Sequence, residues 1–260
     1  MRDVRVGSWT ELHESLFEAS WDPELRRHRS RFAFRGMARE GDELCAGLSR
    51  FGPHAWDLEE PILRTFRKYA RMLVHAPDDS VWGWLAVAQH HGLPTRLVDW
   101  TFSPYVALHF LTEDASAFDR DGVVWAIDYV AAKRLLPGPL AAILAADEAN
   151  VFTTDMLDRA ARSLHDLDAL GHGFVVFLEP PSLDERIVNQ YALFSLMPRG
   201  GTPGRWLADH ADLARRIVVP AGLKWEIRDK LDQANVTERV LFPGLDGLSR
   251  WVRRYYTPRT

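Results

Sequence analysis

The sequence predicts an α+β fold, a single domain in which a mixed, mostly antiparallel sheet is flanked by helices. Apolar runs of strand length and stretches with apolar residues at helical spacing both occur along the chain. The two kinds of segment do not alternate strictly, as they would in a doubly wound parallel sheet. The 260 residues, 47% of them hydrophobic, are enough to bury a core without a disulfide or a metal.

The expected elements can be justified in chain order. Ser and Thr open residues 8–20 before apolar residues at helical spacing, Ser80 caps a second helix, and Pro104 occupies the first turn of a third. The predicted strands are 30–36, 95–101, 122–129, 174–180, 186–196 and 214–221. The predicted helices are 8–20, 58–75, 80–90, 103–114, 222–235 and 245–256, with further helices within 131–170.

Composition and charge narrow the possible classes of function. The formal net charge of −4 does not indicate a broad nucleic-acid-binding face, although it is compatible with a local basic pocket. A single cysteine, Cys45, excludes an intramolecular disulfide and fits a reducing compartment. The N-terminus carries charges where a signal peptide needs an apolar stretch, and no run approaches the ~20 apolar residues of a membrane span. We therefore expect a cytoplasmic protein with no membrane partner.

The stretch FAFRG, residues 32–36, ends a predicted strand with an arginine. Phe32 and Phe34 alternate toward one face of the strand, so Arg35 points to the other. There it is either the ligand of a bound anion or a surface residue in an ion pair. Gly36 beside it permits a backbone turn that residues with a Cβ resist.

A second stretch, QHHGLPTRLVDWTFSPYVALHF at residues 89–110, mixes polar groups with core-type sequence. His91 and Gly92 before a proline are typical of a helix C-terminus. That interpretation leaves unexplained the polar residues that follow, which are Arg96, Asp99, Thr101 and Ser103. The two hydroxyls precede a helix, where they can cap it or hold a ligand against its N–H groups. The alternative is a buried polar network that fixes strand register.

Metal binding is not expected. His90 and His91 are adjacent, so they cannot share one helix face, and the sequence has neither HExxH nor a cysteine pair. Hydrolase or nuclease activity through these histidines and Asp99 is therefore the last of the alternatives.

A third stretch, EPPSLDERIVNQYALF at residues 179–194, leads from a loop into a predicted strand on which Arg186 and Gln190 share a face. A buried Gln needs partners for its amide N–H groups and its carbonyl oxygen. Gln190 therefore either bridges strands or faces a ligand hydroxyl. Glu179 and Glu185 flank the loop and are the nearby carboxylates.

Together these segments resemble the FRG-domain family. FAFRG, the block HGLPTRLVDWT, RIVNQYALF and LFPGLDGL near the C-terminus carry the resemblance, which extends from about Arg31 to Trp251. It implies an N-terminal helical lead-in at residues 1–30, the FRG domain at 31–251 and a tail at 252–260. It also implies a possible toxin or phage-defence effector, with an unknown macromolecular target and a neutralising partner protein.

The chain is similar, more remotely, to mono-ADP-ribosyltransferases of the Arg–Ser–Glu type. Arg35-Gly36, then a Thr-Phe-Ser segment before VALHF, then RIVNQYALF match the order of that pattern, but Gln190 stands where the pattern has Glu. The similarity implies an ADP-ribosyltransferase-like fold, NAD as the substrate, no metal, and transfer of ADP-ribose.

The same similarity implies roles for individual residues. Arg35 and Gly36 would hold phosphate or ribose, Thr101 and Ser103 would brace the pocket, Gln190 with Glu185 would face the ribose, and His91, Arg96 and Asp99 would form a polar floor. A neutral Gln supplies no charge to offset an oxocarbenium-like state. Either Glu179 or Glu185 folds back, or His91 or Asp99 shares the work, or the chain is a sensor module that binds a nucleotide or a modified macromolecule without turnover.

Overall fold

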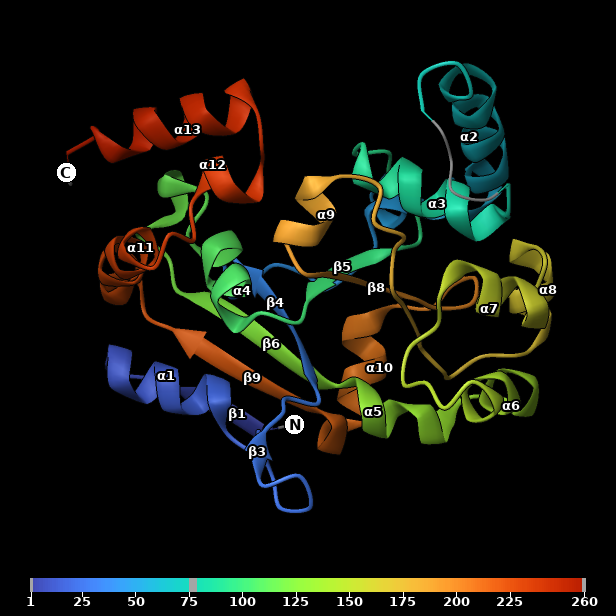
Figure 1. The fold of residues 1–260 in the computed structure, drawn as a ribbon, viewed down its shortest axis with the longest axis horizontal. Coiled ribbons are helices and arrows are strands. Elements are labelled where there is room, and N and C mark those ends of the chain that lie inside the picture. The colour runs from blue at the N-terminus through green and yellow to red at the C-terminus, as the bar shows by residue number, and fades with distance from the viewer. Residues whose placement is uncertain (1, 75–78, 259–260) are drawn as a thin grey trace.

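A seven-stranded sheet runs through the middle of the molecule, which we describe from a computed structural model covering residues 2–74 and 79–258 (Figure 1). Residue 1 of the expected lead-in, residue 75 of the helix expected at 58–75, and residues 259–260 of the expected tail lie outside the described residues. The strands of this sheet are β1 (Arg2–Arg5), β4 (Phe32–Met37), β5 (Val98–Thr101), β6 (Gly122–Asp128), β7 (Val176–Leu178), β8 (Ala192–Leu196) and β9 (Ala214–Val219). Strands β2 (Trp21–Asp22) and β3 (Arg27–His28) pair with each other in a separate hairpin.

Helices surround this sheet. They are α1 (Trp9–Phe17), α2 (Ala55–Ala70), α3 (Val81–His90), α4 (Pro104–Leu111), α5 (Tyr129–Ala132), α6 (Gly138–Ala146), α7 (Thr154–Ala160), α8 (Leu164–Ala169), α9 (Glu185–Asn189), α10 (Pro203–Asp209), α11 (Lys224–Gln233), α12 (Glu238–Leu241) and α13 (Leu245–Tyr255). Short 3₁₀ helices are η1 (Gly47–His54), η2 (Ala115–Ala117), η3 (Lys133–Leu135), η4 (Ala211–Leu213) and η5 (Ala221–Leu223).

The strand order is β1-β9-β6-β4-β5-β8-β7, and β1 and β9 are parallel while all other neighbours in this sheet are antiparallel. The predicted α+β class with a mixed, mostly antiparallel sheet is confirmed. At the centre of the sheet, β4 and β5 pair only at Phe34 and Thr101. Each of these strands pairs over several residues with its other neighbour. The two halves of the sheet therefore separate beyond this contact, and the separation positions the candidate site.

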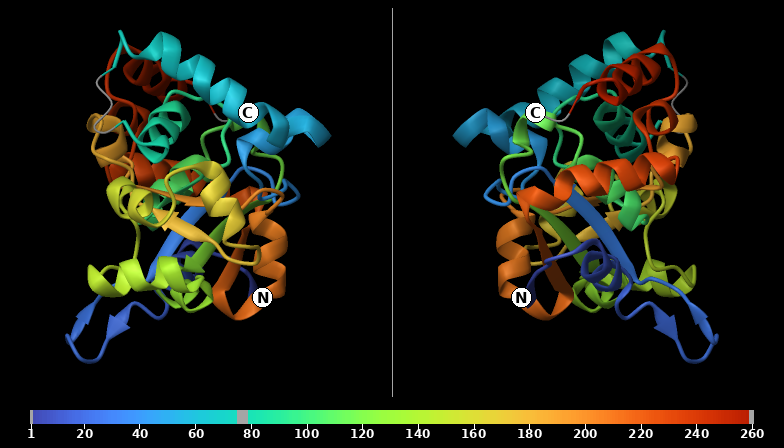
Figure 2. Two further views of the ribbon diagram at one scale, coloured as in Figure 1. Left: turned by 90° about the vertical axis from the view of Figure 1, so that its right-hand side faces the viewer. Right: turned by 90° about the vertical axis from the view of Figure 1, so that its left-hand side faces the viewer.

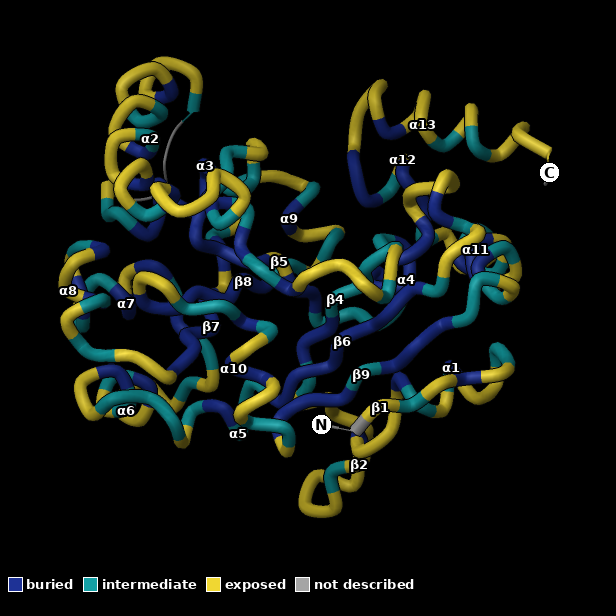
Figure 3. The backbone as a smooth tube through the Cα atoms, turned by 180° about the vertical axis from the view of Figure 1, so that it is seen from behind, coloured by how far each residue is buried: buried dark blue, intermediate teal, exposed yellow. Residues whose placement is uncertain are grey.

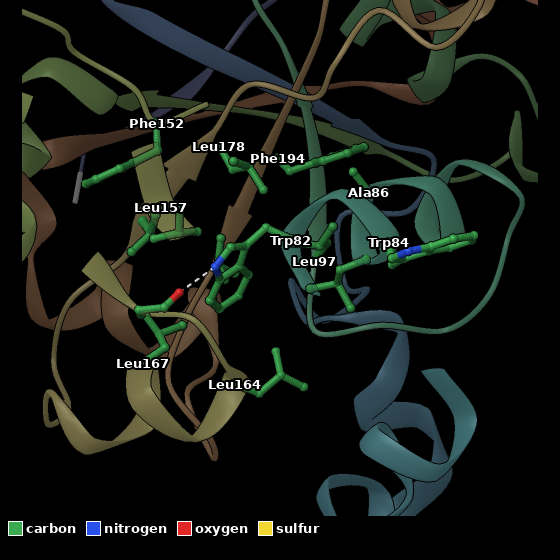
Figure 4. Packing of buried hydrophobic residues seen from close by; sticks show 14 of the residues in the cluster. Trp82, Trp84, Ala86, Leu97, Phe152, Leu157, Leu164, Leu167, Leu178 and Phe194 are labelled. Carbon is green, nitrogen blue, oxygen red and sulfur yellow. Dashed lines mark hydrogen bonds between the residues drawn. The ribbon is translucent and has the colours of Figure 1, made fainter. Parts of the chain in front are cut away.

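Buried side chains pack on both faces of the sheet, and β6 and β9 at its centre are buried along most of their length (Figure 3). Helices α1, α4 and α11 pack with β4, β6 and β9. A separate cluster joins α2, α3 and α6–α8 to β7 and β8. At its centre Trp82 is fully buried, and its indole N–H donates to the Ala161 carbonyl over 2.7 Å (Figure 4). This cluster fixes α3, which ends at the candidate site.

Gly36 does not form the turn that we expected, because β4 continues through it to Met37. The backbone of α4 passes so close that a Cβ at Gly36 would lie 1.8 Å from the Ala107 carbonyl oxygen. The glycine is therefore needed for close packing of a helix on a strand.

The strand predicted at 186–196 is wrong in its first half. Asp184 caps the short helix α9 by accepting from the Ile187 N–H, and only Ala192–Leu196 form a strand, β8. Tyr191 links the two elements with a φ of +50°. Gln190 is thus the C-terminal cap of a helix, so the face that we expected it to share with Arg186 on a strand does not exist.

The other predicted strands and helices are present, most of them shorter than expected. The sequence does not predict β1, the β2–β3 hairpin, α10 or α12. The hairpin projects from the end of the molecule opposite α3 and α9 (Figures 1 and 2). The expected domain boundaries and the relation to the ADP-ribosyltransferase fold stay predictions.

Candidate functional site

A pocket of about 620 Å³ opens where β4 and β5 separate. Its lining comes from β4, the end of α3, β5, α9 and the start of β8, so segments far apart in the sequence meet there. The predicted site residues that line it are Arg35, Gly36, His91, Asp99, Thr101 and Gln190. The size falls within the range of small-molecule sites, and apolar side chains such as Phe34, Trp100 and Phe194 supply part of the wall.

Arg35 places its guanidinium at the separation of the strands. Its Nη1 donates to the Asp99 carbonyl oxygen over 2.7 Å and lies 3.7 Å from the Asp99 carboxylate. Its Nε is buried and has no hydrogen-bond partner among the described residues. Burial lowers the pKa of Arg35, against the opposing effect of Asp99, but an arginine stays charged in proteins. The side chain is 25% exposed, so the pocket holds a half-buried cation whose accessible N–H groups suit an anionic ligand.

Asp99 is held by a chain of side-chain hydrogen bonds. Gln89 donates from Nε2 to the Asp99 carboxylate over 2.8 Å, and its Oε1 accepts from the Thr95 hydroxyl over 2.6 Å. The Thr95 hydroxyl accepts in turn from the Leu97 N–H over 3.0 Å. Because the Leu97 N–H can only donate and the Asp99 carboxylate accepts, the amide of Gln89 has one orientation. Asp99 is the one carboxylate among the lining residues that the structure describes.

A second arginine, Arg186, lines the pocket from α9. Its Nη1 donates to the His90 carbonyl oxygen over 3.2 Å, and its guanidinium lies 4.9 Å from the centre of the Phe242 ring. Arg186 is not among the residues that we expected at the site, although the strand predicted at 186–196 places it on the same face as Gln190. That shared face with Gln190 was the available signal.

The two histidines have different surroundings. The His90 side chain is largely buried, and its Nε2 lies 2.7 Å from an Asp184 carboxylate oxygen. Burial lowers the pKa of His90 in spite of Asp184, which favours the neutral ring. His91 is exposed at the rim of the pocket, with its ring centre 5.1 Å from that of His90. His90 therefore orients α9 through Asp184, while His91 is accessible to a ligand.

Thr101 and Gln190 support the pocket mainly through the backbone. The Thr101 hydroxyl donates to the Gln190 carbonyl oxygen over 2.7 Å and accepts from the Ser103 N–H over 3.0 Å. The Ser103 hydroxyl caps α4 by accepting from the Val106 N–H. The Gln190 amide donates to the Leu241 carbonyl oxygen over 3.0 Å. Gln190 thus connects α9 to α12, and one of its two amide hydrogens is already used.

Arg96 does not form part of the pocket floor, which corrects our expectation. Its guanidinium binds Glu59 over 2.8 and 2.6 Å and Asp168 over 2.8 Å, and its side chain is only 2% exposed. The residue precedes β5, so the alternation that we assumed for 95–101 does not apply to it. Glu185 begins α9 and is exposed outside the lining residues, as is Glu179.

Two further findings concern metal binding and membrane-spanning helices. Within residues 2–74 and 79–258, no three His, Cys, Asp or Glu side chains are grouped so that they could hold a metal ion. Over the same ranges, every helix is too short or too polar to span a membrane.

The fold and the site define an α+β protein with a polar pocket at the centre of a divided sheet. The model of the FRG domain matches residues 30–120, and the chain therefore carries an FRG domain, as its sequence motifs predict. No curated protein and no solved structure matches the chain. The matched segment contains Arg35, Gln89 and Asp99, whereas Arg186 and Gln190, on the opposite wall, lie beyond it.

Proposed function

We propose that the pocket binds an NAD-type nucleotide and that the protein is an ADP-ribosyltransferase-like enzyme. The observation that carries this proposal is that Arg35, whose side chain is 25% exposed, and Asp99, oriented by Gln89, lie inside one pocket. The cation suits a phosphate, and the carboxylate can accept a hydrogen bond from a ribose hydroxyl. The apolar wall gives room for a base.

Cleavage of the bond between nicotinamide and ribose requires a negative charge near the ribose. When the bond between nicotinamide and ribose breaks, the bonding electron pair leaves with the nicotinamide, and positive charge develops on the ribose carbon. An acceptor nucleophile then bonds to that carbon and loses its proton. A fixed carboxylate beside that carbon stabilises the positive charge. We assign this role to Asp99 in place of Gln190, which is neutral and bound to Leu241.

One observation favours a second function, that of a sensor module that binds the nucleotide without turnover. The Asp99 carboxylate already lies 3.7 Å from the Arg35 guanidinium, so part of its charge is offset before any ligand binds. A carboxylate neutralised in this way stabilises an oxocarbenium-like state less. Effector roles in toxicity or phage defence, a neutralising partner and a cytoplasmic location stay predictions.

The test combines binding and turnover. NAD is titrated by calorimetry, and nicotinamide release and transfer of labelled ADP-ribose are measured in a cell lysate. Arg35→Ala is expected to abolish binding, and Asp99→Asn to keep it but lower nicotinamide release by about 10²–10³-fold. Arg27→Gln is the control for charge, because Arg27 is exposed on the distant β2–β3 hairpin. Failure of the folded natural chain to bind NAD would remove the proposal, and binding without product would select the sensor.

A further inference from the structure

Arg35 lies at the junction of more than one hollow. Beside the main pocket is a second hollow of about 380 Å³, which shares Arg35, Gln89 and Asp99 with it. Its other walls are the 3₁₀ helix η1 and the segment that joins α3 to β5. The ion pair of Arg35 and Asp99, with Gln89, therefore forms a partition that a long ligand would cross.

Arg50 lines this second hollow together with Arg35. It is exposed, and no hydrogen bond or ion pair to it is found in the part of the chain that the structure describes. A third hollow of about 410 Å³ has Arg35, Cys45 and Arg50 in its lining, together with Asp42 and Glu43. Neither of these carboxylates forms an ion pair with Arg50 within the described ranges, so Arg50 keeps its donors for a ligand. Its charge also lowers the pKa of Arg35, with which it shares this lining.

The second hollow also offers an aromatic surface. Phe51 follows Arg50 in η1 and is 48% exposed, although it is a large apolar side chain. Leu93 and Pro94 are further apolar residues of the same lining. A planar base can stack on such a ring. The hollow therefore combines a cation for phosphate with a surface for a base, and it borders the main pocket at Arg35, Gln89 and Asp99.

We propose that the site takes a dinucleotide as a two-lobed ligand, with its diphosphate held between Arg35 and Arg50 and its adenosine half on Phe51. The other nucleoside fills the main pocket beside Asp99. This inference rests on the proposed function and deepens it, because it assigns Arg50 and Phe51 as specificity residues for the adenosine diphosphate half. Mononucleotides then occupy only one lobe.

The proposal can be tested with two readouts. Calorimetry compares NAD, ADP and nicotinamide mononucleotide on the natural chain, Arg50→Gln, Phe51→Ala and the control Arg27→Gln. Loss of a charge-assisted phosphate contact corresponds to a weakening of about 10-fold or more. We expect Arg50→Gln and Phe51→Ala to weaken NAD and ADP by this factor, and nicotinamide mononucleotide by less than about 3-fold. Arg27→Gln should bind all three as the natural chain does.

Cys45 supplies the second readout, since it is the single cysteine of the chain and lines the same hollow. NAD and ADP should slow its reaction with a thiol reagent, whereas nicotinamide mononucleotide should not. If NAD binds and Arg35→Ala abolishes binding, but Arg50→Gln has no effect and Cys45 is not protected, the two-lobed site is wrong while the proposed function stands. If the folded natural chain binds neither NAD nor ADP, both fall together.

Discussion

Replacing Gly36 by alanine tests the packing that places Arg35 at the pocket. The new Cβ would lie 1.8 Å from the Ala107 carbonyl oxygen and 2.9 Å from the Leu111 nitrogen. Both neighbours are backbone atoms of α4, so no side-chain rotation can relieve the overlap. To restore an ordinary contact of 3.4 Å with the oxygen, α4 would have to retreat by 1.6 Å, which is 3.4 minus 1.8.

Such a shift has a substantial energetic cost. Overpacking a well-packed core typically costs about 1–3 kcal/mol and occasionally more. Because the obstacle is a whole helix, we expect the upper end, about 3 kcal/mol. At roughly 2–4 °C per kcal/mol for a domain of this size, the melting temperature should fall by about 6–12 °C.

Thermal and denaturant unfolding of Gly36→Ala measure this effect, with Gly41→Ala as the matched control. A Cβ at Gly41 meets nothing within 4 Å, so the control should stay within about 0.5 kcal/mol of the natural chain. If Gly36→Ala is as stable as the control, α4 does not press on β4 as described, and the packing explanation of the Arg-Gly motif fails.

Three further predictions concern the polar groups. Arg96→Met should destabilise the fold by about 3–5 kcal/mol in denaturant unfolding without removing a ligand contact, because Glu59, 4% exposed, would keep a buried charge without its partner. Burial alone would raise the pKa of Glu238, but hydrogen bonds from an arginine lower it to about 2, below its ordinary 4.5. The contribution of the Glu238 carboxylate to stability is therefore full above pH 4.5 and is lost as the pH falls toward 2. Unfolding curves of Glu238→Gln between pH 2 and 5 should therefore show a weaker pH dependence than those of the natural chain. Gln89→Leu should lower nicotinamide release more than it weakens NAD binding in calorimetry, because it frees the Asp99 carboxylate to rotate; equal losses would contradict a positioning role.

The Glu238 prediction depends on a network at the C-terminal end of the fold. Arg254 of α13 donates to Glu238 of α12 over 2.7 Å and to Asp232 of α11 over 2.7 Å. This network holds α13 on the body of the molecule, although most of its outer surface is exposed (Figure 3). It also fixes α12, whose backbone carbonyl groups accept hydrogen bonds from the side chains of Asn189 and Gln190.

Local signals predicted most of the elements, since a helix cap or an alternating strand depends on neighbours within a few residues. Ser80 caps α3 as expected, and Pro104 stands in the first turn of α4. Of the two roles left open for Ser103, the structure shows the helix cap, and Ser103 is not among the residues that line the main pocket. The same reasoning failed at RIVNQYALF, where β-branched residues indicate a strand. Asp184 starts a helix there instead, and a residue with positive φ ends the segment, so the local preference was overridden.

The sequence by itself determined the α+β class and the FRG domain, and it singled out Arg35, Asp99 and Thr101, which line one pocket, because these depend on composition, periodicity and short motifs. Only the tertiary structure decided which polar groups share a pocket. It directed Arg96 into a buried ion pair, used Gln190 as a bridge and brought Arg186 to the wall. The physical reason is that these outcomes depend on which strands pair and where the sheet divides. Those contacts join residues about a hundred positions apart, beyond the reach of any local pattern.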